Sequence, residues 1–141
     1  MIYISNSPEE TIGIGQRLGA LMKGGEIIAY RGDLGAGKTT MTRGIALGMG
    51  AGDCVSSPTF AIVNEYHGAE LTLYHFDMYR ITTPEALEAT GFYDYISKRS
   101  VIAVEWSENT EGLLDENITV DIRTDKDDSD KRTIEITGVD L

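Results

Sequence analysis

The residues from Gly32 to Thr39, GDLGAGKT, combine three glycines with one lysine and one threonine. They match the spacing G-x-x-x-x-G-K-[ST] in full. Glycines let successive backbone N–H groups turn inward around a phosphate, because no side chain blocks the close approach. The ammonium group of Lys38 can reach the β- and γ-phosphates, and the hydroxyl group of Thr39 can ligate Mg²⁺. The segment therefore predicts a P-loop that binds a nucleoside triphosphate.

A P-loop needs a strand before it and a helix after it, and the flanking sequence predicts both. The segment 26–30 (EIIAY), with its apolar run IIAY, is typical of a short buried strand, and residues 37–49 predict a helix with one apolar face. The positive end of that helix would add to phosphate binding. The residues expected in the nucleotide site are Gly35, Ala36, Gly37, Lys38, Thr39 and Thr40.

Two acidic residues stand at the ends of apolar strands. Asp77 closes the run LTLYHFD, and Glu105 closes the run VIAVE. In an open parallel sheet the ligand crevice lies beyond the carboxyl ends of the strands, so both acids are expected beside the phosphates. With Thr39 they form the candidate metal ligands, and with Lys38 the candidate catalytic group. Their sequence positions do not decide which acid holds Mg²⁺ and which places a water.

Other polar residues carry weaker signals. Thr59, in the segment SSPTF, is either a switch residue that contacts the metal or γ-phosphate or part of an ordinary loop. His67 and His75 show no metal-ligand spacing, which favours structural roles. Structural or exposed positions also explain three arginines better than a role as a charge-stabilising finger: Arg31, Arg43 and Arg80.

The remaining pattern predicts an α/β fold with a mostly parallel central sheet flanked by helices and a C-terminal antiparallel hairpin. A first helix is expected over 7–25, capped by Ser7 and Glu10 and ended by Gly24-Gly25. The other expected elements are strands at 59–66 and 71–79, a helix at 82–91 capped by Thr83, a helical turn at 92–99, a strand at 101–106 and the hairpin 118–123 with 132–138.

Two glycines, Gly44 and Gly48, fall inside the helix expected over 37–49. Each costs helix propensity of about 1 kcal/mol relative to alanine. Close packing of this helix against a neighbouring element would explain why they are present.

Length, charge and cysteine content limit the possible functions. The 141 residues suit one domain, 1–141. The net charge of −11 opposes strong direct binding to nucleic acid and suits a basic protein partner. No apolar run approaches the roughly 20 residues of a membrane span. Cys54 is the only cysteine, and the first residues do not resemble a secretory signal, so we expect a cytoplasmic protein.

Four motifs in order, GDLGAGKTT, SPTF, HFDMYR and VEW, resemble the TsaE family, bacterial P-loop ATPases of tRNA threonylcarbamoyladenosine synthesis. The resemblance spans nearly the whole chain, from Ser7 to RTIEITG. It implies an ATP–Mg²⁺ site with Lys38 and Thr39 on phosphate and metal, and with Glu105 as a metal-side or catalytic acid supported by Asp77. It also places Thr59 in the nucleotide-sensing loop, Trp106 near the site, and three residues at the border of the nucleotide: Asn6, Glu108 and Arg132.

The same resemblance implies a protein partner, the complex of TsaD and TsaB, which the ATP cycle would reset between turnovers. With no obvious finger arginine, we expect slow hydrolysis by the chain alone and faster hydrolysis with the partner. Two other functions stay open. One is a small nucleoside or metabolite kinase, although an arginine-rich lid segment is missing from the sequence. The other is a nucleotide-dependent binding module that does not hydrolyse ATP.

Overall fold

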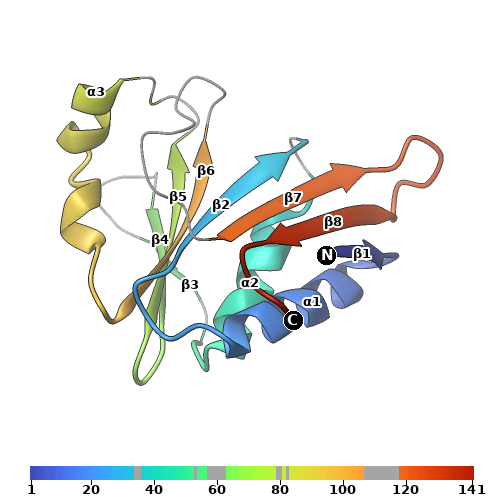
Figure 1. The fold of residues 1–141 in the computed structure, drawn as a ribbon, viewed down its shortest axis with the longest axis horizontal. Coiled ribbons are helices and arrows are strands. Elements are labelled where there is room, and N and C mark those ends of the chain that lie inside the picture. The colour runs from blue at the N-terminus through green and yellow to red at the C-terminus, as the bar shows by residue number, and fades with distance from the viewer. Residues whose placement is uncertain (34–35, 53, 57–62, 79–80, 82, 107–117) are drawn as a thin grey trace.

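In this computed structural model, the described residues form an eight-stranded sheet with helices on both faces (Figure 1). The described residues are 1–33, 36–52, 54–56, 63–78, 81, 83–106 and 118–141. The strands are β1 (Ile2–Ser5), β2 (Ile27–Gly32), β3 (Cys54–Ser56), β4 (Val63–His67), β5 (Thr72–Met78), β6 (Ser100–Trp106), β7 (Ile118–Thr124) and β8 (Arg132–Thr137). The helices are α1 (Pro8–Ala20), α2 (Lys38–Gly48), α3 (Pro84–Ala89) and the 3-10 turn η1 (Phe92–Tyr95).

The centre of the sheet is parallel, and each side is antiparallel. The strand order is β1-β8-β7-β2-β6-β5-β4-β3. Strands β7, β2, β6 and β5 pair in parallel, whereas β8 and β1 on one side and β4 and β3 on the other pair antiparallel. The predicted fold class is confirmed, including the hairpin β7–β8. No strand is predicted at β1 or β3, which are short edge strands paired on one side only.

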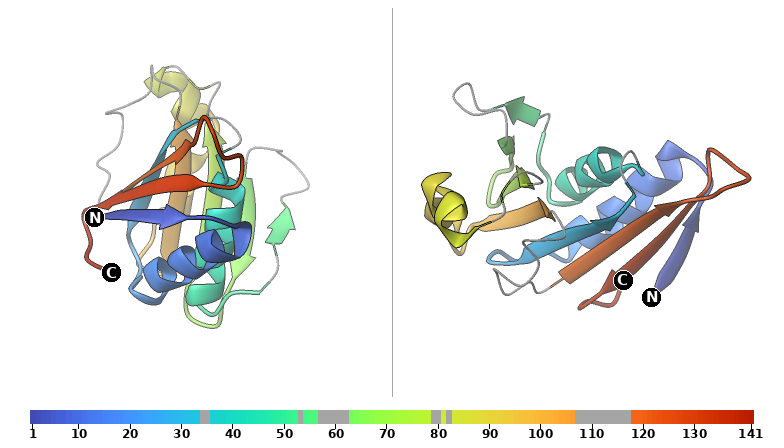
Figure 2. Two further views of the ribbon diagram at one scale, coloured as in Figure 1. Left: turned by 90° about the vertical axis from the view of Figure 1, so that its right-hand side faces the viewer. Right: turned by 90° about the horizontal axis from the view of Figure 1, so that it is seen from above.

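Alternation along the central strands separates two apolar cores. Ile28 of β2 packs with α1 and α2, while its neighbour Ile27 packs on the opposite face with Leu87 of α3 and Phe92 of η1. Figure 2 shows α1 and α2 side by side on one face of β2, β7 and β8. In the described part of the chain, no helix combines the length and apolar character that a membrane crossing requires. Strand β6 is buried on both faces from Val101 to Val104, as its apolar sequence predicts.

Helices α1 and α2 meet through glycines, as the sequence predicts for Gly44 and Gly48. A Cβ atom on Gly48 would lie 2.1 Å from the carbonyl oxygen of Gln16 in α1. On the facing helix, a Cβ atom on Gly19 would lie 2.1 Å from the carbonyl oxygen of Ile45. The two backbones are therefore in direct contact, and this contact sets the position of α2 over the sheet.

Local hydrogen bonds explain where α1 begins and ends. The Ser7 hydroxyl accepts from the N–H of Glu10 at 3.2 Å, as predicted, but the Glu10 carboxylate accepts from the N–H of Asn6 rather than from Ser7 itself. The helix ends at Ala20, so the predicted extension to Gly24 is wrong. The carboxylate of Glu26 accepts from the N–H groups of Lys23 and Gly24, which holds them in a loop.

The other predicted elements occur close to their expected positions. Thr83 caps α3 through its hydroxyl group, which accepts from the N–H of Ala86 at 3.1 Å. The two strands expected at 59–66 and 71–79 correspond to β4 and β5, which pair antiparallel. Residues 59–62, expected at the start of the β4 strand, lie outside the described residues.

The glycine contact predicts opposite effects of alanine at two positions of α1. Gly19→Ala should lower the free energy of unfolding by about 1–3 kcal/mol, because its methyl group meets backbone that cannot move aside. Gly13→Ala is the matched control, because a Cβ atom there meets nothing within 4 Å. It should raise stability by about 0.5–1 kcal/mol through helix propensity. Urea denaturation checks both values, and equal effects at the two positions would contradict the close packing.

Candidate functional site

The carboxyl ends of three neighbouring parallel strands meet beside the P-loop. Strand β2 enters the P-loop, and its Tyr30 lies in register with Glu105 of β6. Glu105 is in turn in register with Asp77 of β5. Paired positions on parallel neighbours present their side chains on the same face of a sheet. The structure therefore places the two predicted acids side by side, with Asp77 exposed and the Glu105 side chain 23% exposed.

The helix after the P-loop begins without a side-chain cap. Ser7 and Thr83 cap α1 and α3 with their hydroxyl groups, whereas α2 begins at Gly37, whose φ of 108° makes a left-handed turn. Uncapped N–H groups at a helix N-terminus suit an anion. Lys38 opens this helix, and its Nζ lies 4.0 Å from Oε1 of Glu105. Thr39 follows it and is exposed.

The other oxygen of Glu105 lies against a buried histidine. Nε2 of His75 is 2.8 Å from Oε2 of Glu105, within hydrogen-bond distance, although the N–H does not point straight at the oxygen. Partial burial alone would raise the pKa of Glu105, but the contact with His75 and the charge of Lys38 outweigh it and lower the pKa. Glu105 is therefore ionised at neutral pH. The sequence signal for this contact is the spacing of His75 and Asp77, which puts both on one face of β5.

A buried hydroxyl relay supports the backbone of Lys38. The Thr42 hydroxyl donates to the carbonyl oxygen of Lys38 at 2.7 Å, and it lies 2.7 Å from the hydroxyl group of Tyr30. A threonine hydroxyl has one hydrogen, so the Tyr30 hydroxyl donates to Thr42. Burial raises the pKa of Tyr30 well above its usual range, which keeps this donor protonated. Nothing in the sequence marks this relay, since it joins a strand to a helix.

The hairpin β7–β8 holds the P-loop at both ends. Oδ2 of Asp33 accepts from the N–H and the hydroxyl group of Thr124, each at 3.0 Å. On the far side of the loop, Nε of Arg132 donates to the carbonyl oxygen of Ala36 at 2.8 Å. These contacts lie on either side of residues 34–35. The hairpin therefore fixes the points at which the P-loop leaves β2 and enters α2.

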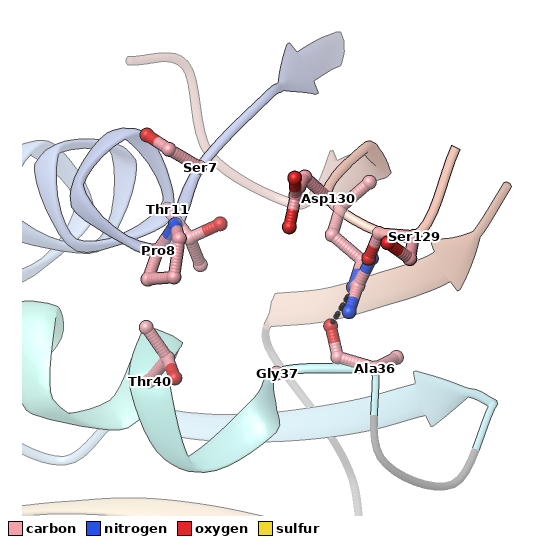
Figure 3. A pocket seen from close by; sticks show the side chains of 9 residues that line it. Ser7, Pro8, Thr11, Ala36, Gly37, Thr40, Ser129 and Asp130 are labelled. Atoms are coloured by element: carbon pink, nitrogen blue, oxygen red, sulfur yellow. Dashed lines mark hydrogen bonds between the residues drawn. The ribbon is translucent and has the colours of Figure 1, made fainter.

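A small pocket opens beside the start of α2 (Figure 3). It lies between the N-terminus of α1, the end of the P-loop and the β7–β8 loop. Asn6 immediately precedes the first of the lining residues, which are Ser7, Pro8, Thr11, Ala36, Gly37, Thr40, Ser129, Asp130 and Arg132. The structure thus brings Arg132 and Thr40 together next to the P-loop. Gly35, Thr59 and Glu108 lie outside the described residues, so their predicted roles stay predictions.

Comparison with known proteins identifies close relatives. Residues 5–134 match the family model of TsaE, described as "Threonylcarbamoyl adenosine biosynthesis protein TsaE". A tRNA threonylcarbamoyladenosine biosynthesis protein TsaE of Bacillus subtilis (strain 168) is 40% identical over 134 residues, which cover 94% of this chain and 82% of that protein. The protein of the same name from Haemophilus influenzae is 48% identical over 90 residues, covering 64% of this chain and 57% of its relative.

A solved structure shares the fold. The crystal structure of Bacillus subtilis YdiB matches with a TM-score of 0.72 and 34% sequence identity. The match covers 95% of this chain and 82% of that chain. The sheet and helices that form the candidate site therefore belong to an architecture seen in a crystal structure.

The contact between Asp33 and Thr124 predicts a shift that NMR can measure. Hydrogen bonds from the N–H and then the hydroxyl of Thr124 lower the pKa of Asp33 from 3.8. Thr124→Val removes only the hydroxyl bond, so the pKa of Asp33 should rise part of the way back. Because the folded pKa is lowered, the stability from this bond is present above pH 3.8 and is lost as the pH falls through the folded pKa.

The NMR signal of the Asp33 carboxyl group, followed as the pH is changed, measures this pKa directly. The control is Thr119→Val, on the same strand but without a contact to Asp33. An Asp33 titration that Thr124→Val leaves unchanged would show that the hydroxyl bond does not hold the P-loop.

Proposed function

This chain belongs to the TsaE family of threonylcarbamoyl adenosine biosynthesis proteins, and from that premise we propose that it binds and slowly hydrolyses ATP with Mg²⁺. The observation that carries the proposal is the meeting, at one sheet edge, of an uncapped helix N-terminus, the Lys38 ammonium group and the acids of β5 and β6. Phosphate oxygens accept hydrogen bonds from such N–H and ammonium donors, and Mg²⁺ favours oxygen ligands such as carboxylates.

Each group at this edge has a role in the proposed reaction. Lys38 and the N–H groups at the start of α2 bind the phosphates, and Thr39, Asp77 and Glu105 supply oxygens for the metal. Bound Mg²⁺ would neutralise charge on the phosphate oxygens. Glu105 has a lowered pKa, so it stays a carboxylate that can hold metal or orient a water.

The pocket beside Gly37 is the proposed place for the rest of the nucleotide. It opens next to the helix N-terminus, and polar groups of α1 and the β7–β8 loop line it. Arg132 lines it and Asn6 immediately precedes the lining residue Ser7, and on the family resemblance we propose that both border the nucleotide. Thr59 and Glu108 complete the proposed nucleotide site on the same resemblance.

We further propose that the ATPase acts on a complex of TsaD and TsaB, in support of N6-threonylcarbamoyladenosine formation on tRNA. The Arg132 guanidinium, which contacts the P-loop backbone, donates to the carbonyl oxygens of Ala36, Ser129 and Lys131. It is thus engaged in holding the loop, and a finger from a partner would supply the missing charge. The net charge of −11 suits a basic protein surface and opposes strong direct binding to tRNA.

Substitution of Glu105 tests this function. Glu105→Ala should lower ATP turnover by about 100-fold or more, because it removes the acid that holds metal or water. ATP affinity in the absence of Mg²⁺ should change little, since Lys38 and the backbone N–H groups remain. Phosphate release, with and without the TsaD–TsaB complex, measures turnover, and a fluorescent nucleotide analogue measures affinity.

The exposed carboxylate of Glu135, on β8, provides the control. Glu135→Gln should keep wild-type turnover and stimulation. Fast hydrolysis by the wild-type chain alone, unchanged by the partner, would contradict the proposed mechanism. A Glu105→Ala variant that still supports tRNA modification would favour a binding module without hydrolysis. A phosphorylated small-molecule product would favour a kinase.

A further inference from the structure

His75 is a buried polar residue to which the family motifs and the proposed reaction assign no role. It lies in the middle of β5, on the sheet face that α1 and α2 cover, and is 5% exposed. Its Nε2 is 2.8 Å from Oε2 of Glu105. The other ring nitrogen, Nδ1, is buried and has no hydrogen-bond partner in the described part of the chain. A buried polar atom without a partner is costly, so stability alone favours an apolar residue here.

Tyr30 closes the other side of the histidine ring. The two rings meet edge to face, with centroids 5.8 Å apart and an angle of 69° between their planes. Tyr30 is 1% exposed, and its hydroxyl group is held by Thr42, which itself bonds the carbonyl oxygen of Lys38. The imidazole therefore cannot swing away from Glu105 without opening the core. Contacts run without a break from the backbone of Lys38 to the carboxylate of Glu105.

The two oxygens of Glu105 have different partners. Oε2 lies against His75, and Oε1 is 4.0 Å from Nζ of Lys38. When the Lys38 ammonium group binds phosphate, it no longer holds Oε1 of Glu105 in its present place. Without another contact, the Glu105 carboxylate would move with the ammonium group toward the phosphate. His75 is fixed in the core and keeps its contact with Oε2 of Glu105. Hydrogen bonds at such sites are often poorly aligned before the ligand binds, which agrees with the bent geometry seen here.

We propose that His75 is a positioning residue, which holds Oε2 of Glu105 so that Oε1 is presented to the Mg²⁺–nucleotide. This inference rests on the proposed ATPase function and adds a residue to it. His75 touches neither nucleotide nor metal in this arrangement. Its effect passes through the orientation of one carboxylate, in the way that outer groups orient metal ligands in other proteins.

Three variants separate positioning from packing. His75→Leu introduces an apolar side chain of similar size and removes the donor. His75→Gln keeps a donor, because its amide nitrogen reaches about as far from the backbone as Nε2. Leu73→Ala is the control for lost packing: Leu73 is fully buried on the same face of β5, two residues before His75. Urea denaturation of each variant shows that it is folded under the assay conditions.

Two measurements are made on the full chain, with the TsaD–TsaB complex present for turnover. His75→Leu should lower kcat about 10-fold or more. His75→Gln should recover most of the lost turnover, and Leu73→Ala should keep it. The second measurement is the affinity of a fluorescent ADP analogue with and without Mg²⁺. His75→Leu should lose much of the gain in affinity that Mg²⁺ provides and keep the Mg²⁺-free affinity.

The outcomes distinguish this inference from the proposed function. If folded His75→Gln and His75→Leu lose turnover and Mg²⁺-dependent affinity equally, or if Leu73→Ala loses as much, the residue acts through packing and the inference is wrong. If the wild-type chain binds Mg²⁺–ADP but hydrolyses no ATP with the complex present, the proposed function is wrong. The Mg²⁺ dependence of the affinity then still decides whether His75 orients Glu105.

Discussion

The parallel pairing of β2 with β6, and of β6 with β5, is the constraint on which the candidate site depends. Because the three strands run in the same direction, the P-loop and the acids leave the sheet at one edge. The register sets Glu105 opposite Tyr30 on one neighbour and opposite Asp77 on the other. If one of these three strands ran in the opposite direction, the group at its carboxyl end would lie at the far edge. In the described sheet, the antiparallel pairs lie on either side of the parallel strands β7, β2, β6 and β5. They therefore do not separate the P-loop from the two acids.

The packing of α2 connects this edge to the core. Glycines let α2 lie directly against the backbone of α1, which fixes its height over the sheet. At that height the Thr42 hydroxyl reaches both Tyr30 of β2 and the carbonyl oxygen of Lys38. Buried polar groups with few partners favour one arrangement strongly, because any other leaves them unpaired. The start of α2 is thus positioned from below by these hydroxyl groups and from the side by the hairpin β7–β8.

Much of the local structure follows from short-range patterns. The caps at Ser7 and Thr83, the strand and helix around the P-loop and the buried strand β6 all depend on residues a few positions apart. The sequence predicts that α1 ends at Gly24-Gly25, because this pair is a strong stop signal. The helix ends earlier, at Ala20, and the Glu26 carboxylate accepts from the N–H groups of Lys23 and Gly24, which are then not available to extend the helix. The sequence also indicates that Gly44 and Gly48 face a close neighbour, but it does not name α1 as that neighbour.

The sequence alone predicts phosphate-binding chemistry, since the P-loop motif needs only contiguous residues and the strand and helix beside them. It also determined which strands end in acids. Only the tertiary structure decided that His75 contacts Glu105, that Thr124 bonds Asp33 across 91 positions and that Arg132 bonds Ala36 across 96. These pairs depend on strand order and register, which arise from burial summed over the whole chain. A local sequence pattern does not predict strand order and register, because the burial that sets them involves contacts between residues distant in sequence.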